Sequence, residues 1–303
     1  MDMKRRDFIK QSALGVGAML AGAHLAKGDD TAPAAMYDPY GEVVLGQSKL
    51  KVSRVCLGTG SSGWQRESNQ VRLGKDKFDA LIKGSYDRGV RMFDLADLYG
   101  SHPFVVPALQ GIPRDKYAIV SKIWFQDGGI PDSDRPDAYI VIPRFLKELK
   151  TDYIDLLLLH CLTSSNWPNE MRRQMDILSK FKEKGVVRAV GVSCHSLQAL
   201  EAAAKEPWVD SVHTRINPYA MSMDGSPERV MPVLRKLHAA GKGVVGMKII
   251  GNGNLRDDVD RREQSIRFVL RLGCVDVLNV GCESLNQVDD LASSVRKVPT
   301  KTA

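Results

Sequence analysis

Short apolar runs alternate with longer amphipathic segments along most of the chain after Tyr40. The runs have the length of strands, and the segments between them space their apolar residues as helices with one buried face do. Eight such pairs follow one another. The expected strands are "VCLGTG", "RMFDLA", "YAIVSKIW", "IDLLLLH", "VRAVGVS", "VDSVHTRIN", "GVVGMKII" and "VDVLNVGC", and the helices expected after them cover residues 76–89, 103–110, 137–150, 169–184, 196–206, 227–240, 262–272 and 284–297.

This alternation predicts an α/β fold in which helices cover a parallel sheet. Eight units in about 250 residues have the size of a closed (β/α)8 TIM barrel. Two doubly wound halves are the alternative, although no G-x-G-x-x-G motif follows the first strand. Ahead of the strands, "GEVVLGQSKLKVSRV" predicts a β-hairpin with its turn near Gly46 to Lys49, which we expect to cap the bottom of the barrel.

The first 40 residues predict a signal peptide and linker, which leaves residues 41–303 for the barrel. The start is charged, an apolar stretch follows, and small residues offer cleavage points. "KRRDFIK" resembles a twin-arginine (Tat) signal, which implies recognition by the Tat export machinery and a periplasmic or extracellular location. The apolar stretch is short and rich in Gly and Ala, so we expect no stable membrane anchor. An ordinary amphipathic helix is the alternative.

Charge and cysteine content exclude several functions. The formal net charge is +7, and it is spread along the chain without a basic run, so we expect no nucleic-acid binding. The cysteines form no C-x-x-C pair and lie in or after apolar runs, so they are predicted to be buried thiols, with no zinc or iron–sulfur site. They are Cys56, Cys161, Cys194, Cys274 and Cys282.

Polar side chains stand at the ends of three successive expected strands. Asp94 and Tyr99 follow the second strand, Lys122 ends the third, and His160 ends the fourth. In a (β/α)8 barrel, these strand ends form the active face. Each residue alone could be a turn residue, a packed aromatic, an exposed strand end or a core histidine. Because the pattern recurs three times in succession, a shared site is favoured.

Five segments, "FDLADLYG", "SKIW", "LLLLH", "VVRAVGVS" and "NVGCESLNQV", resemble in order and spacing the motifs of the aldo-keto reductase superfamily, from about Gly41 onward. The resemblance implies a (β/α)8 oxidoreductase that interconverts small carbonyl compounds and alcohols with NADP(H) or NAD(H) and without a metal. It also implies that the catalytic residues are Asp94, Tyr99, Lys122 and His160.

Those residue types suit carbonyl reduction, which needs a proton at the oxygen. An unperturbed tyrosine has a pKa near 10, so we expect Lys122 to lower the pKa of Tyr99, the proton donor. Asp94 is expected to hold the lysine, and His160 to orient the substrate oxygen. Asp97 has no counterpart among these four residues and is predicted to be a turn residue.

The resemblance also implies a set of cofactor-binding positions. Gly58, Thr59 and Ser193 fit the family pattern on the nicotinamide side, while His213 and Lys248 are departures from it. Glu283 stands where many members carry an arginine for the 2′-phosphate of NADPH; a carboxylate there favours NADH, unless it only caps the last helix. The full predicted set is Gly58, Thr59, Ser193, His213, Lys248, Gly281, Glu283 and Gln287.

Two functional classes follow from these residues. The first is an NAD(P)-dependent reductase or alcohol dehydrogenase. The second is a cofactor-binding barrel that acts as a redox sensor or non-catalytic subunit, because the nicotinamide-side residues depart from the family pattern.

Overall fold

The computed structural model describes residues 35–135 and 137–300, so most of the predicted signal and linker lies outside the described residues. Eight parallel strands close into a barrel in the order β10-β3-β4-β5-β6-β7-β8-β9, which confirms the predicted (β/α)8 fold. The strands are β3 (Val55–Gly58), β4 (Met92–Asp94), β5 (Ala118–Ile123), β6 (Ile154–Leu162), β7 (Val187–Cys194), β8 (Ser211–Arg215), β9 (Gly243–Met247) and β10 (Val277–Gly281).

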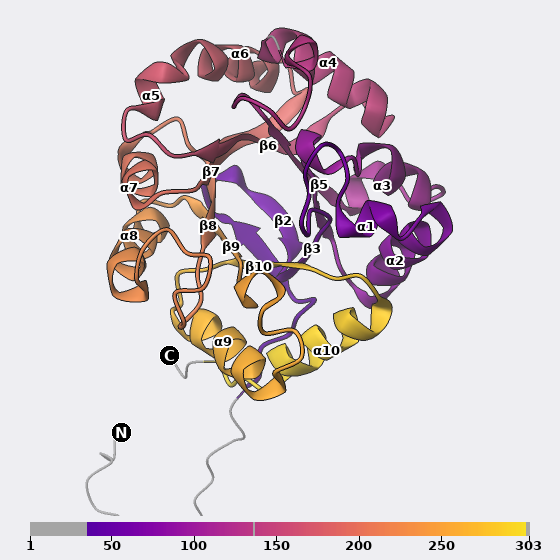
Figure 1. Cartoon of the computed structure of the whole chain (residues 1–303), viewed down its shortest axis with the longest axis vertical. Helices are drawn as coiled ribbons and strands as arrows, with labels where there is room; N and C mark the ends of the chain where they lie inside the picture. Colours follow the sequence, from indigo (N-terminus) through magenta and orange to yellow (C-terminus); the bar gives the residue numbers. More distant parts are fainter. Residues whose placement is uncertain (1–34, 136, 301–303) are drawn as a thin grey trace, which may run out of the picture. The chain divides into compact units, whose positions relative to one another are not determined.

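Helices form an outer ring around the strands (Figure 1). Each expected helix is present, and the segment 169–184 is divided at Met171 into two helices, α5 and α6. The helices are α1 (Asn69–Arg72), α2 (Lys75–Arg88), α3 (His102–Ala108), α4 (Ala138–Leu149), α5 (Trp167–Glu170), α6 (Arg172–Glu183), α7 (Leu197–Lys205), α8 (Pro227–Ala239), α9 (Val259–Arg271) and α10 (Leu285–Arg296).

Local sequence explains why these segments take this form. All nine residues of β6 are buried, as expected of a strand with the barrel interior on one side and helices on the other. In α4, Val141, Phe145 and Leu149 repeat at helical spacing and are fully buried. The side chains of Ser196 and Ser284 cap α7 and α10 by accepting a bond from the backbone N–H three residues later.

The amino-terminal hairpin closes one end of the barrel, as predicted. Strands β1 (Glu42–Leu45) and β2 (Leu50–Ser53) flank a 3-10 turn, η1 (Gly46–Ser48). The backbone N–H of Gln47 donates to Gly241 O at 2.6 Å, and its side-chain amide donates to Val209 O at 2.9 Å. Both acceptors precede barrel strands, so the hairpin covers the amino ends and leaves the carboxyl ends for a site.

All five cysteines are buried, as predicted. Within the described ranges, no helix is long and apolar enough to cross a membrane.

Candidate active site

A buried ion pair joins the carboxyl ends of two adjacent strands. Lys122, on β5, is completely buried, and its Nζ donates to Asp94 Oδ2 at 2.7 Å and to Leu95 O at 2.8 Å. His213 Nε2 lies 3.1 Å from Asp94 Oδ1, so both carboxylate oxygens have a partner. Burial disfavours the charged carboxylate, but Lys122 and His213 outweigh it and hold the pKa of Asp94 well below its usual range.

Tyr99 and His160 complete the predicted set of four. The hydroxyl of Tyr99 lies 3.4 Å from Lys122 Nζ and 3.4 Å from His160 Nε2, and the tyrosine and histidine rings meet edge to face. Burial, and then the charge of Lys122, keep the pKa of His160 well below its ordinary value, so its ring is neutral. The structure therefore brings Asp94, Tyr99, Lys122 and His160 together around one hydroxyl.

Lys122 lowers the pKa of Tyr99, as expected, but burial has a larger effect in the opposite direction. Burial raises the pKa of Tyr99 to about 12, and the charge of Lys122 offsets only part of that rise. Lys122 is itself engaged by Asp94 at a shorter distance, which reduces its net effect on the tyrosine. Tyr99 is accordingly protonated at neutral pH, with a cation in place to stabilise its phenolate.

The loop that contains Gly60 and Gly63 packs against the ring of Tyr99. A Cβ added at Gly60 would come within 2.3 Å of the ring, and one at Gly63 within 2.8 Å, so only glycine allows this close approach. Further along the loop, Arg66 has φ 62°, in the left-handed region, and its N–H donates to Leu98 O at 2.9 Å. The loop is thereby fixed to the turn that carries Tyr99.

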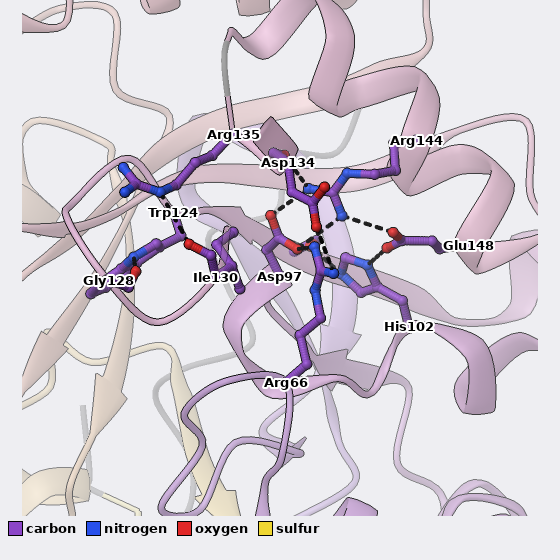
Figure 2. A network of polar contacts seen from close by, with 11 residues as sticks. Arg66, Asp97, His102, Trp124, Gly128, Ile130, Asp134, Arg135, Arg144 and Glu148 are labelled. Atoms are coloured by element: carbon purple, nitrogen blue, oxygen red, sulfur yellow. Dashed lines mark hydrogen bonds and ion pairs between the residues drawn. The ribbon is translucent and has the colours of Figure 1, made fainter. Parts of the chain in front are cut away.

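Asp97 lies in a turn, as predicted, and has a further role that no sequence motif showed. It begins the 3-10 turn η2 (Asp97–Tyr99), and its side chain is only 1% exposed. Arg144, on α4, grips both carboxylate oxygens, with N–O distances of 3.0 and 2.6 Å, and Arg66 approaches one of them at 3.3 Å (Figure 2). A bidentate arginine pair of this kind is among the stronger polar contacts in proteins. Asp97 is therefore a buried anchor for the tyrosine turn.

The same network continues from Arg144 through Glu148 to His102 (Figure 2). Arg144 Nη1 donates to Glu148 Oε1 at 2.7 Å, and Glu148 Oε2 lies 2.7 Å from His102 Nδ1. Burial opposes the charge of Glu148, but its bonds with His102 and Arg144 lower its pKa to about 2. His102 Nε2 in turn lies 2.8 Å from the hydroxyl of Ser121, the neighbour of Lys122. The network thus connects the tyrosine turn with the strand that carries the lysine.

A cavity of about 310 Å³ extends from Tyr99 along the carboxyl ends of β9 and β10 to α10. Five of the eight predicted cofactor residues line it: Gly58, Lys248, Gly281, Glu283 and Gln287. Side-chain atoms of neighbouring residues lie close to the backbone of both glycines in this lining. A Cβ at Gly281 would come within 2.2 Å of Ser61 Oγ, and one at Gly58 within 2.8 Å of Asn279 Oδ1. Neither position accepts a larger residue without displacing a neighbour.

The other three predicted cofactor residues are fully buried and do not line the cavity. Thr59 Oγ1 donates to Asp94 O at 2.9 Å, and His213 bonds the Asp94 carboxylate, so both hold the ion pair. Ser193 Oγ has no hydrogen-bond partner among the described residues. Their predicted contact with a cofactor stays a prediction.

The end of the cavity near α10 contains two basic residues, Arg256 and Arg262, that are absent from the predicted set of cofactor-binding residues. Glu283 Oε1 accepts from Asn69 Nδ2 at 2.7 Å, and its other oxygen lies 3.9 Å from Arg256 Nη1. Arg256 and Arg262 both line the cavity. They come from the loop before α9 and from α9 itself, where no motif marked them.

Fold and site together define a (β/α)8 barrel protein with a tyrosine-centred acid–base site at the carboxyl ends of its strands. The profile described as "Aldo/keto reductase family" matches residues 54–299. The chain therefore belongs to the aldo/keto reductase family.

Individual relatives are more distant. Methylglyoxal reductase DkgB of Salmonella typhimurium is 28% identical over 158 residues, which cover 49% of this chain and 55% of that protein. The chain spans about half the length of the curated relatives that it matches first. Among solved structures, aldo-keto reductase AKR11C1 from Bacillus halodurans, in its holo form, has a TM-score of 0.68 at 20% identity and covers 86% of this chain and 93% of its own. An aldo-keto reductase from Klebsiella pneumoniae in complex with NADPH has a TM-score of 0.64 at 19% identity, with 88% and 91% covered.

Replacing Asp97 tests its role as a buried anchor. Asp97→Asn keeps the shape but removes the charge that Arg144 needs, so we expect a loss of about 2–3 kcal/mol in the free energy of unfolding, measured with urea. Asp289→Asn, which breaks the exposed pair with Arg88, is the control and should cost under about 1 kcal/mol. Equal effects of the two changes would contradict the anchor role.

Proposed function

We propose that this protein is an NAD(P)-dependent oxidoreductase that interconverts small aldehydes or ketones and the corresponding alcohols. The observation that carries the proposal is the position of the Tyr99 hydroxyl, 3.4 Å from both Lys122 Nζ and His160 Nε2, at one end of an elongated cavity. Membership of the aldo/keto reductase family supports it. The name of one relative, a methylglyoxal reductase, is consistent with small carbonyl substrates.

The cavity residues fit a dinucleotide. Gly58 and Gly281 line the cavity without side chains, so a ligand can approach the backbone there closely. Lys248, Arg256 and Arg262 supply positive charge along the cavity, which suits phosphate groups. Asn279 Oδ1 is buried without a hydrogen-bond partner among the described residues, so a donor on a ligand would satisfy it.

The four clustered side chains divide the remaining chemistry. The nicotinamide, when bound, supplies or accepts the hydride. Tyr99 gives its proton to the carbonyl oxygen; because its pKa is raised to about 12, the proton is in place at neutral pH. Lys122 stabilises the phenolate that forms, and Asp94 keeps the lysine charged and oriented. Neutral His160 orients the substrate oxygen beside the tyrosine hydroxyl.

Two substitutions test this division of roles. Tyr99→Phe should reduce turnover of a small aldehyde by at least about 10²-fold, with cofactor affinity little changed, because it removes the general acid alone. Lys122→Met should do comparable damage, because the cation that stabilises the phenolate of Tyr99 is lost. Steady-state rates at neutral pH would measure both; a Tyr99→Phe protein with most of its activity would rule out the assignment.

Cofactor choice depends on Glu283. Its carboxylate lies in the part of the cavity where Arg256 approaches it, so it both repels a 2′-phosphate and occupies a cation that could bind one. We expect the unchanged protein to bind NADH at least as well as NADPH in fluorescence titrations. Glu283→Arg should improve NADPH binding selectively, and Glu283→Gln should do so more weakly. A strong NADPH preference of the unchanged protein would show that Arg256 and Arg262 determine the choice.

We also propose that the protein is exported by the Tat route with its cofactor already bound. The support is the "KRRDFIK" segment, which lies outside the described residues. Free NAD(P)H is regenerated inside the cell, so an exported enzyme must retain its nicotinamide and cycle it in place. Retention at vanishing external concentration requires slow release, which corresponds to nanomolar affinity or about −12 kcal/mol.

Export and retention can be measured separately. The exported protein, purified without added cofactor and then denatured, should release about one nicotinamide nucleotide per chain; none at all would refute retention. Replacing Arg5 and Arg6 by Lys should trap the protein inside the cell. An unaltered location would show that the paired arginines are a chance match and that the enzyme works in the cytoplasm.

A further inference from the structure

Three successive strands present basic or imidazole side chains on the rim beside His160. His195 directly follows β7, Arg215 ends β8, and Lys248 directly follows β9. In the barrel β7 pairs with β8 and β8 with β9, so the three lie side by side. They stand at the same carboxyl ends as the tyrosine site. We call His195, Arg215 and Lys248 the basic rim.

Contacts connect the basic rim to the catalytic cluster. Arg215 Nη2 donates to His195 Nδ1, which leaves the proton of this imidazole on Nε2. His195 Nε2 then lies 3.3 Å from Cys161 Sγ, and its ring centroid lies 6.3 Å from that of His160. Arg215 is thus one side chain away from the histidine that orients the substrate.

Positive charge exceeds negative charge at the basic rim. Burial, and then Arg215 and Lys248, lower the pKa of His195 to about 3. The pKa of Lys248 is lowered by burial and then by Arg215, so the two cations are close enough to repel each other. Asp224 is the carboxylate paired with Arg215, at 3.3 Å from Nη1. The basic rim therefore combines two cations, Arg215 and Lys248, with one paired carboxylate, that of Asp224.

Arg215 keeps donors for another partner. A guanidinium has five N–H groups, and Asp224 and His195 approach only its two terminal nitrogens. One further N–H remains on each terminal nitrogen, whereas Nε is buried and has no hydrogen-bond partner among the residues that the structure describes. The side chain is 21% exposed, so it is reachable from the rim. A planar, bidentate acceptor such as a carboxylate matches this group best.

We propose that Arg215, in the basic rim, binds a carboxylate of the substrate, so that the protein acts on carbonyl compounds that also carry a carboxylate. This inference rests on the proposed reductase function and names its substrate class. The carbonyl lies at Tyr99 and His160, and the carboxylate lies a few bonds away at Arg215. On another side of His160, Trp124 packs edge to face at 5.5 Å and Trp64 packs on Trp124, which gives the carbon skeleton an apolar wall.

Matched substrate pairs test the inference by activity. Succinic semialdehyde is compared with butanal, and 4-carboxybenzaldehyde with benzaldehyde. The carboxylated member of each pair should have the higher kcat/KM, and Arg215→Gln should reduce that preference by about 10- to 100-fold, the effect of a lost hydrogen bond to a charged group. Arg215→Lys keeps the positive charge but loses the bidentate N–H donors, so it should retain part of the preference for the carboxylated substrate. Arg88→Gln, an arginine paired with an aspartate on the outer surface, should leave it unchanged.

A binding measurement separates this inference from the proposed function. In calorimetry, benzoate should bind the unchanged protein more tightly than benzamide does, and Arg215→Gln should remove the difference. Because Arg215→Gln leaves Asp224 unpaired, the double variant Arg215→Gln with Asp224→Asn serves if the single variant fails to fold. Benzoate binding without any aldehyde turnover would overturn only the reductase function. Aldehyde turnover without a carboxylate preference, or benzoate and benzamide binding equally, would overturn the carboxylate site.

Discussion

The site is organised around the ion pair between Lys122 and Asp94, inside the barrel. Removing two charges from water costs several kcal/mol, which only close geometry and further hydrogen bonds can offset. Here the lysine also bonds Leu95 O, and the carboxylate also bonds His213. Because losing either partner would leave an isolated buried charge, the ends of β4 and β5 are fixed relative to each other. The hydroxyl of Tyr99 lies 3.4 Å from the lysine of that pair, and His160 lies 3.4 Å from the same hydroxyl.

A second, more peripheral set of charges fixes the turn that carries the tyrosine. Asp97, two residues before Tyr99, is held by Arg144 and Arg66, so a helix and a loop outside the barrel both restrain the turn. Proton transfer requires a hydroxyl held within hydrogen-bonding reach of the substrate, and a short 3-10 turn alone would not supply that precision. The network in Figure 2 therefore restrains the turn of the proposed proton donor, and its members do not line the cavity beside Tyr99.

The barrel separates stability from function along its axis. At the amino ends, the hairpin and its backbone bonds close the interior. At the carboxyl ends, unequal loops bring different chemistry to one centre: aromatic rings at Trp64 and Trp124, and basic groups at Arg215 and Lys248. A substrate carbonyl placed at Tyr99 would have an apolar surface and a cationic one within reach, which is the basis of the proposed substrate class.

The sequence by itself determined the barrel, because strand and helix periodicities are local properties that repeated eight times. It also located Asp94, Tyr99, Lys122 and His160, since a polar residue at the end of an apolar strand must face the common rim of a parallel barrel. Only the tertiary structure decided what each charge pairs with. Asp97 is a turn residue, as predicted, but its contact with Arg144, 47 positions away, is visible only in the tertiary structure. The bond between His213 and Asp94, from across the barrel, is a second such contact. The pKa of Tyr99 likewise depends on burial, a property of the packed protein that no motif contains.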